Sequence, residues 1–187
     1  MHFVARELYH IYNRGNNRNR IFFKEDNYTF FLNKIRKDLL AYCDVLAYCL
    51  MPNHYHLLVH VKEYQFDKPM DPLARKIGTL QSSYTQAINK QENRTGSLFQ
   101  QKAKSKNVND YALTCFHYIH QNPMRAKIVS NLDNWKYSSF NSYVGSGGAD
   151  FINKHLAFQL LEVPKEVELF RMESNGMVDI DHLRYIL

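Results

Sequence analysis

The sequence predicts an α+β fold in which two helices cover one face of an antiparallel sheet. Short segments rich in strand-forming apolar residues alternate with longer segments of helical period, and their order is strand, helix, strand, strand, helix, strand. This β-α-β-β-α-β order is that of a ferredoxin-like unit, and a further helix follows it. With 187 residues, of which 45% are hydrophobic, the chain can form one domain with a sizeable core.

The first strand is predicted over residues 7–13, and a polar, basic loop with a glycine for its turn follows it. The arginines of this loop, Arg14, Arg18 and Arg20, suit contacts with phosphate groups, although an ordinary solvated loop has the same composition. The first helix is predicted over residues 25–42. Its apolar residues share one face: Tyr28, Phe31, Leu32, Ile35 and Leu39.

The next two strands form a predicted hairpin, and the second of them carries a pair of histidines. Residues 44–50 and 51–60 are rich in apolar residues, with a Pro-Asn turn between them. Alternate residues of a strand share a face, so the imidazoles of His54 and His56 can converge on one metal ion. The pair alone is a weak signal, because two half-exposed polar positions give the same pattern.

Asp71 and Pro72 are placed to cap and begin the second helix, predicted over residues 72–92. The last strand of the unit is predicted within residues 97–106. Three of its residues alternate as lysines: Lys102, Lys104 and Lys106. On a strand they form a one-sided basic stripe that can follow a phosphate backbone, although lysines also protect edge strands from pairing.

The third helix is predicted over residues 109–121, ending before Pro123. Tyr118 and Asn122 are four residues apart and therefore share a helical face. Packed over the two histidines, they suit metal-assisted phosphoryl transfer: the histidines and Asn122 hold Mg²⁺ or Mn²⁺, and Tyr118 attacks the phosphorus. The sequence leaves open that Tyr118 and Asn122 are ordinary core and cap residues.

The segment after the third helix contains aromatic residues that we expect to pack back on the domain: Trp135, Tyr137, Phe140 and Tyr143. A glycine-rich break follows, so we divide the chain into a domain of residues 1–145 and a C-terminal extension of residues 146–187. The extension contains a predicted helix over residues 164–172 and an apolar end over residues 183–187. No chemistry is assigned to it.

The net charge of +6 favours an anionic partner, for which nucleic acid is the default candidate. Three widely spaced cysteines, Cys43, Cys49 and Cys115, give no disulfide framework, and we expect reduced thiols in a cytoplasmic protein. No apolar run reaches transmembrane length and no signal peptide is evident, so no membrane partner is expected.

Five motifs span most of the chain: Tyr9–Asn16 (YHIYNRGN), Met51–His56 (MPNHYH), Gly96–Gln100 (GSLFQ), Tyr118–Ala126 (YIHQNPMRA) and Trp135–Ser139 (WKYSS). Together they resemble the REP-associated tyrosine transposases, a branch of the single-tyrosine HUH transposase superfamily. The resemblance implies metal-dependent cleavage of single-stranded DNA near hairpins, with a 5′-phosphotyrosine intermediate and a free 3′-hydroxyl.

By this resemblance His54 and His56 are metal ligands, Tyr118 is the nucleophile, and Asn122 is the third ligand, where insertion-sequence relatives usually carry glutamine. Arg125 belongs to the same motif and joins the loop arginines and the lysines as a predicted DNA contact. The implied partner is single-stranded or hairpin DNA. A monomer is favoured, and a dimer is possible.

Two other interpretations stay open. A domesticated hairpin-binding protein without cleavage activity would keep the basic residues, but the complete set of His54, His56, Tyr118 and Asn122 argues against it. A zinc-dependent hydrolase of small molecules would use the histidine pair and bind no DNA. The pair has no acidic ligand near it in the sequence, which argues against a zinc hydrolase.

Overall fold

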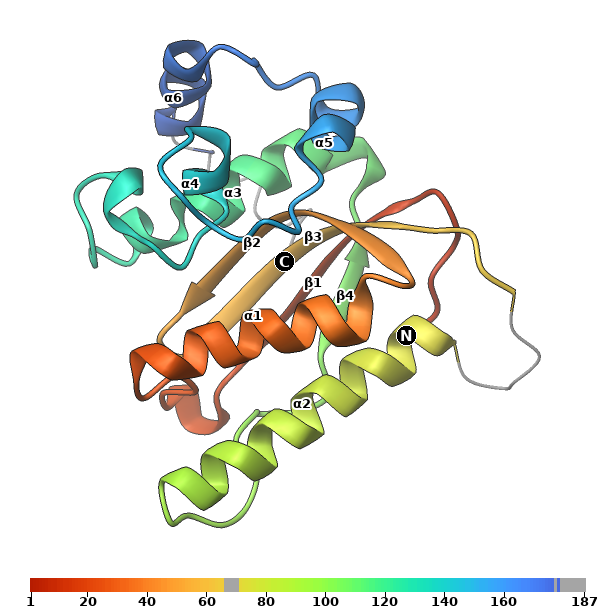
Figure 1. The fold of residues 1–187 in the computed structure, drawn as a ribbon, viewed down its shortest axis with the longest axis vertical. Coiled ribbons are helices and arrows are strands. Elements are labelled where there is room, and N and C mark those ends of the chain that lie inside the picture. The colour runs from red at the N-terminus through yellow and green to blue at the C-terminus, as the bar shows by residue number, and fades with distance from the viewer. Residues whose placement is uncertain (66–70, 177, 179–187) are drawn as a thin grey trace.

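The structure is a computed structural model that describes residues 1–65, 71–176 and 178. One four-stranded antiparallel sheet has the strand order β2-β3-β1-β4, and the helices α1 and α2 lie on one side of it (Figure 1). The strands are β1 (Leu8–Arg14), β2 (Cys43–Met51), β3 (His54–Val61) and β4 (Lys104–Asn107). The predicted α+β fold is confirmed, with β1 and β3 as the central strands.

Three long helices accompany the sheet: α1 (Glu25–Leu39), α2 (Pro72–Gln91) and α3 (Ala112–Arg125). Three shorter helices follow: α4 (Phe140–Tyr143), α5 (Lys154–Leu161) and α6 (Val167–Asn175). Short 3₁₀ turns are η1 (Asn16–Arg18), η2 (Asn109–Tyr111) and η3 (Leu132–Asn134). None of the helices in the described parts of the chain is long and apolar enough to span a membrane.

The two faces of β3 have different neighbours, as the alternation of its residues predicts. Tyr55 packs on the helical face, where its ring lies 5.0 Å from that of Phe31 and its hydroxyl accepts a 2.7 Å hydrogen bond from Gln81 of α2. His56 lies on the opposite face, where its ring is 5.6 Å from that of Tyr118 on α3. The sheet therefore separates the main core from a second layer that contains α3.

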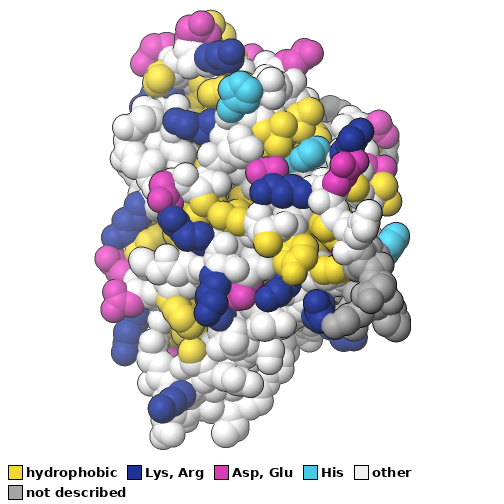
Figure 2. Space-filling view, turned by 45° about the vertical axis from the view of Figure 1, so that its right-hand side comes forward, with side chains coloured by type: hydrophobic (Ala, Val, Ile, Leu, Met, Phe, Trp, Pro, Cys, Tyr) yellow, Lys and Arg dark blue, Asp and Glu magenta, His cyan; other side chains and the backbone are white. Residues whose placement is uncertain are grey.

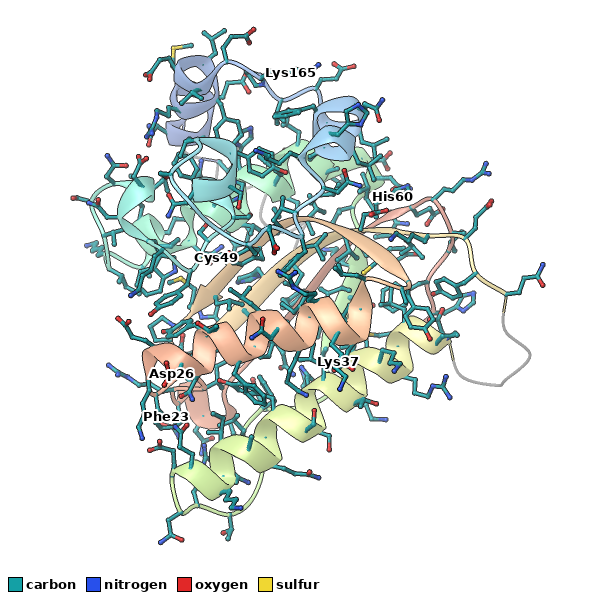
Figure 3. The ribbon with its side chains drawn as sticks, in the orientation of Figure 1. Phe23, Asp26, Lys37, Cys49, His60 and Lys165 are labelled. Carbon is teal, nitrogen blue, oxygen red and sulfur yellow. The ribbon has the colours of Figure 1, made fainter. Side chains whose placement is uncertain are left out.

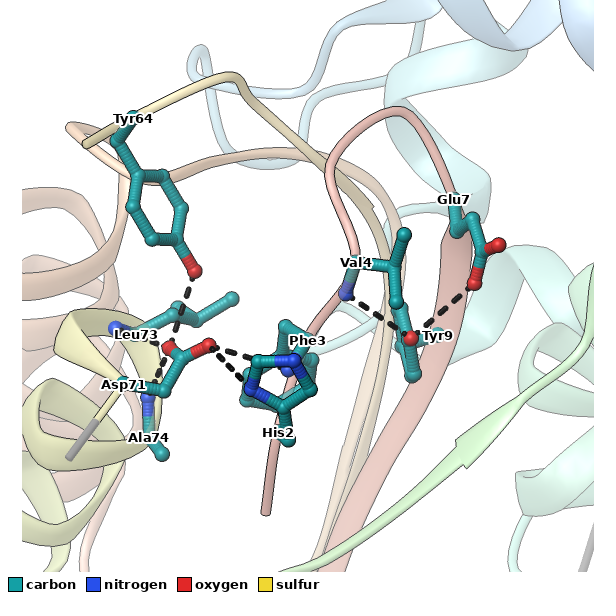
Figure 4. A network of polar contacts seen from close by, with 9 residues as sticks. All are labelled: His2, Phe3, Val4, Glu7, Tyr9, Tyr64, Asp71, Leu73 and Ala74. Atoms are coloured by element: carbon teal, nitrogen blue, oxygen red, sulfur yellow. Dashed lines mark hydrogen bonds and ion pairs between the residues drawn. The ribbon is translucent and has the colours of Figure 1, made fainter. Parts of the chain in front are cut away.

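Asp71 caps α2 as predicted, and its buried carboxylate does more than cap. It accepts hydrogen bonds from the backbone N–H groups of Leu73 (2.9 Å) and Ala74 (3.2 Å). It also accepts from the N–H of Phe3 (3.1 Å) and the hydroxyl of Tyr64 (3.0 Å), as Figure 4 shows. One carboxylate thereby joins the start of α2 to the N-terminal segment and to the residues that follow β3.

The prediction that the third helix ends before Pro123 is wrong, because α3 continues to Arg125. A proline has no N–H, so the carbonyl of Ile119 loses its usual helical partner. The side-chain amide of Asn122 donates to that carbonyl at 3.4 Å and to the carbonyl of Tyr118 at 2.8 Å. These bonds offset the loss and allow the helix to pass through the proline.

The last strand is shorter than predicted, since β4 begins only at Lys104. The residues before it are irregular and are tied to the end of β1 by single contacts. Asn13 donates to the carbonyl of Gln101 at 2.8 Å, and the N–H of Gln100 donates to the carbonyl of Arg14 at 3.0 Å. Lys102 is therefore outside the strand, and the predicted stripe of three lysines is reduced to Lys104 and Lys106.

The aromatic segment packs back on the sheet and α1, as expected. The ring of Tyr137 stacks on that of Tyr28 with centroids 3.6 Å apart, and Trp135 donates to the carbonyl of Leu50 at 3.1 Å. The hydroxyl of Tyr143 donates to the carbonyl of Leu46 at 2.6 Å. These contacts fasten the segment after α3 to β2.

The three cysteines are free and buried; Cys49, labelled in Figure 3, lies in β2. The C-terminal extension contacts the sheet through Asn153, whose N–H donates to the carbonyl of Val45 at 3.0 Å. The helix predicted over residues 164–172 is α6, which begins slightly later than predicted, while α5 of the same extension was not predicted. The apolar end at residues 183–187 lies outside the described residues.

Candidate active site

The predicted histidine pair lies at the start of β3, with the two ring centroids 5.0 Å apart. Asn53 orients the first ring. Its Oδ1 lies 2.7 Å from His54 Nδ1, while its Nδ2 donates to the carbonyl of Arg18 at 3.1 Å. Because the oxygen of Asn53 can only accept, His54 Nδ1 carries the proton and His54 Nε2 keeps a lone pair. The nitrogen that faces away from Asn53 is thus the one able to bind a metal.

Asn122 brings an oxygen to this lone pair from α3. Its Nδ2 is used by the backbone of the same helix, so its Oδ1 points toward the sheet and lies 3.5 Å from His54 Nε2. Two acceptors face each other at this distance. A cation between or beside them would satisfy both lone pairs, because neither side chain has a proton to donate to the other.

Burial keeps both histidines neutral. Burial lowers the pKa of His54. The pKa of His56 lies well below its usual value, first because of burial and then because of His10 and His54 nearby. A neutral imidazole is the form that ligates metals, so the pair is available as ligands at neutral pH.

Tyr118 lies one helical turn before Asn122 and is almost fully buried over the sheet. The guanidinium of Arg125 lies 5.8 Å from the centroid of its ring. Burial raises the pKa of the Tyr118 phenol to about 12, while Arg125 and, to a smaller extent, Asn122 lower it. The phenol is therefore protonated at neutral pH, and its activation requires additional positive charge at the moment of reaction.

A cavity of about 380 Å³ opens beside the tyrosine and the histidine pair. Tyr118, His54 and His56 are among the residues that line it. The cavity is also lined by cationic and amide side chains: Arg14, Arg18, Lys104, Gln100, Gln101, Asn13 and Asn53. A hollow lined by a phenol, imidazoles and cationic side chains suits a phosphodiester.

The structure sorts the predicted DNA contacts into two groups. Arg14, Arg18 and Lys104 line the cavity, and Lys106 follows Lys104 on the same face of β4, where it pairs with His10. The other three, Lys102, Arg20 and Arg125, do not line it. On the face shown in Figure 2, lysine and arginine side chains are distributed among acidic and apolar ones and do not form one continuous patch.

Each residue of the second group has a different environment. Lys102 lines another cavity, of about 560 Å³, together with His2 and Arg75. Arg20 lies near Tyr28, whose pKa its charge lowers in part. Arg125 donates to Gln121 Oε1 at 3.4 Å and to the carbonyl of Val178, so its guanidinium is already engaged by protein atoms.

One residue beside the site was not singled out in the sequence analysis. His10 of β1 is fully buried, and its Nε2 lies 2.8 Å from His56 Nδ1. A partner of this kind depends on the register between β1 and β3, in which His10 is opposite Leu58. The alternation of His10 and Tyr12 on β1 was the available signal, but it does not reveal the neighbouring strand.

The donor set fits a hexacoordinate cation. Within residues 1–65, 71–176 and 178 no three His, Cys, Asp or Glu side chains form a metal site by themselves. A cation here would therefore be held by two imidazole nitrogens and the amide oxygen of Asn122. Such a set leaves positions for water and phosphate oxygens and suits Mg²⁺ or Mn²⁺.

Comparison with known proteins gives concordant results. The family described as "Transposase IS200 like" matches residues 4–122. A Haemophilus influenzae protein described as a candidate REP-associated tyrosine transposase is 26% identical over 129 residues, which are 60% of this chain and 70% of the relative. The solved structure of a REP-associated tyrosine transposase bound to a REP hairpin matches with a TM-score of 0.60 at 15% identity. The match covers 81% of this chain and 87% of that one. Since the family match spans more than half of the chain, the protein belongs to the IS200-like transposase family, and the resemblance to REP-associated tyrosine transposases is confirmed.

Proposed function

We propose that this protein cleaves and rejoins single-stranded DNA beside DNA hairpins, as an HUH-type transposase with a phosphotyrosine intermediate. One observation carries the proposal: Tyr118, His54 and His56 line one cavity that also has arginine and lysine side chains on its wall, and Asn122 of α3 lies 3.5 Å from His54. Membership of the transposase family supports a DNA-processing role. The related fold of a transposase bound to a REP hairpin supports a hairpin as the partner.

The side chains divide the work of the reaction. Arg14, Arg18 and Lys104 hold the phosphates of the strand in the cavity. The Tyr118 oxygen attacks the scissile phosphorus in line, forming an O–P bond while the bond to the 3′ oxygen breaks. The proton lost by the phenol ends on that 3′ oxygen, so the products are a 5′-phosphotyrosine and a free 3′-hydroxyl. Attack of a 3′-hydroxyl on the phosphotyrosine reverses the step and rejoins DNA.

His54, His56 and Asn122 would hold Mg²⁺ or Mn²⁺. When bound, the cation supplies neutralisation of the charge that develops on the phosphate and a field that favours the phenolate. The protein's own contribution includes the orientation of two of these ligands, fixed by Asn53 for His54 and by the backbone of α3 for Asn122. A buried phenol next to these ligands reacts only when a phosphate has entered.

The test is adduct formation with end-labelled strands that carry a hairpin, in the presence of Mn²⁺. The wild-type protein is expected to give a denaturant-resistant protein–DNA adduct, and Tyr118→Phe none. Tyr84→Phe and Tyr111→Phe serve as matched controls, since neither tyrosine has an amide or carboxylate side chain four residues further on, where Tyr118 has Asn122. These two variants are expected to keep the adduct.

Three results would contradict the proposal. An adduct in Tyr118→Phe that maps to another tyrosine would overturn the choice of nucleophile. Cleavage without any adduct would make a water molecule the nucleophile. Hairpin binding by the wild type without cleavage would make the protein a DNA-binding module.

The proposal also assigns roles to the two segments of the chain and an oligomeric state to the protein. We assign DNA processing to residues 1–145 and treat residues 146–187 as an extension, whose described part packs on α3 and β2. We propose a monomer, because Tyr118 of α3 lies beside His56 of its own chain, with ring centroids 5.6 Å apart. A cytoplasmic location is proposed as well and agrees with the free, buried cysteines. Sedimentation of the protein with and without a hairpin measures the oligomeric state.

A further inference from the structure

His10 is the buried neighbour of the histidine pair. It lies on β1, on the same face of the sheet as His56, and its side chain is fully buried. His10 Nε2 lies 2.8 Å from His56 Nδ1, and the two rings are within 18° of parallel. Tyr12 stacks on His10 with centroids 4.7 Å apart. This packing leaves His10 little freedom to rotate away from His56.

His10 Nε2 and His56 Nδ1 share one proton at this distance. The ring that carries this proton determines whether His56 can bind a metal ion through Nε2. If His10 donates, His56 carries its own proton on Nε2 and has no lone pair left for a ligand. If His56 donates from Nδ1, its Nε2 keeps a lone pair on the other side of the ring. Only the second arrangement allows His56 to bind a cation through Nε2, because Nδ1 is covered by His10.

We propose that His10 is a positioning residue, which accepts the Nδ1 proton of His56 and thereby fixes the tautomer and ring orientation that bind the cation. The inference rests on the proposed function, in which His56 is a metal ligand. Asn53 has the same relation to His54, at 2.7 Å. The two ligand rings are thus oriented by different partners, one adjacent in sequence and the other on the neighbouring strand.

Partners of this kind typically change metal affinity by 10- to 100-fold. The test uses the full chain without DNA and Mn²⁺ as the only probe, with free Mn²⁺ measured by electron paramagnetic resonance. His10→Leu fills the space without an acceptor and is expected to weaken Mn²⁺ binding by about 10- to 100-fold. His10→Gln places an amide oxygen near the position of Nε2 and is expected to restore most of the affinity.

A second measurement reads the proton directly. Nitrogen NMR of histidine-labelled protein without metal is expected to show His56 protonated on Nδ1 in the wild type and in His10→Gln. His10→Leu is expected to lose this preference. His60→Leu is the matched control, because His60 lies on the same face of β3 but four residues beyond His56, near the end of the strand. It should change neither the affinity nor the His56 tautomer.

The outcomes separate this inference from the proposed function. Wild-type Mn²⁺ affinity and an unchanged His56 tautomer in His10→Leu would overturn the role of His10 while leaving the metal site intact. A loss equal to that of His56→Ala, without rescue by His10→Gln, would make His10 a ligand and not a positioning residue. Unchanged affinity in His56→Ala would remove the metal site itself, and with it both proposals. Thermal unfolding checks that each variant is folded.

Discussion

His54 Nε2 and Asn122 Oδ1 face each other at 3.5 Å, although 68 residues separate them in the chain. Both atoms are held as acceptors, His54 through its bond to Asn53 and Asn122 through its bonds to the backbone of α3. Each orientation is fixed by a local contact that does not involve the other side chain. The site is therefore preorganised for a positively charged group before any ligand arrives.

Replacing the histidine pair should separate cleavage from binding. In His54→Ala/His56→Ala we expect cleavage to fall by about 10³-fold or more, because charge neutralisation at the phosphate contributes several kcal/mol. DNA affinity should change little, since the cationic wall of Arg14, Arg18 and Lys104 remains. Gel assays of cleavage beside fluorescence anisotropy of a labelled hairpin measure the two. A parallel loss of both activities would refute this division.

The two lysines of β4 should contribute to the salt dependence of DNA binding. For a single strand, each lost phosphate contact lowers the slope of log K against log[salt] by about 0.7, so Lys104→Gln/Lys106→Gln should lower it by about 1.4. Lys102→Gln is the matched control, because Lys102 lines the other cavity. An equal effect of Lys102→Gln would restore the three-lysine stripe that the sequence predicts. An unchanged slope in the double variant would leave the lysines as guards of an edge strand.

Acid should destabilise the fold through His117. Burial lowers the pKa of this histidine from 6.5 to about 4. Its neighbours are Ser174 at 3.3 Å and the carboxylate of Glu173 at 3.9 Å, and His120 lies one turn along the helix. Between these two pKa values the unfolded chain binds a proton that the folded protein does not. Stability is therefore present above pH 6.5 and declines as pH falls toward 4, by at most about 3 kcal/mol from this group.

Urea unfolding across that pH range measures this decline, with His117→Gln as the comparison. The variant should lose less stability on acidification than the wild type. The wild-type slope also contains His120, whose pKa burial lowers in the same direction, so the variant should keep part of the pH dependence. Parallel curves for the two proteins would show that His117 contributes nothing.

Two glycine substitutions should have opposite effects on stability. A Cβ at Gly15 would overlap the carbonyl oxygen of Asn19, so Gly15→Ala must displace the loop that carries Arg18 and should destabilise by about 2 kcal/mol. A Cβ at Gly78, inside α2, would meet no atom within 4 Å. Gly78→Ala should therefore stabilise by about 0.5–1 kcal/mol. Thermal unfolding compares the two, and a neutral Gly15→Ala would show that the loop yields easily.

The sequence predicts the parts of this fold that local patterns control. Periodicity located every strand and long helix, and the Asp71–Pro72 pair located the start of α2. The prediction failed at Pro123 because the rule for proline considers only the backbone, whereas the Asn122 side chain supplies the missing donor. It failed at Lys102 because contacts from β1 to Gln100 and Gln101, and not a strand ladder, hold that segment.

In the candidate site, too, local spacing reveals some residues, while contacts between distant parts of the chain stay hidden. His54, His56, Tyr118 and Asn122 could be proposed from the sequence, because spacing places each pair on one face of its own element. His10 was missed because its contact with His56 depends on strand register, which a single sequence does not contain. The engagement of Arg125 by Val178 was missed for a similar reason, because it joins α3 to a distant part of the chain.

The position of β1 and β3 at the centre of the sheet has a consequence for motion. The histidine half of the site is paired on both sides by strands, so its amides belong to the part of a fold that opens last in hydrogen exchange. The tyrosine half is on α3, whose contacts with β3 described above are between side chains. The cavity can therefore widen to admit a strand of DNA by a shift of α3, without breaking any hydrogen bond between the strands.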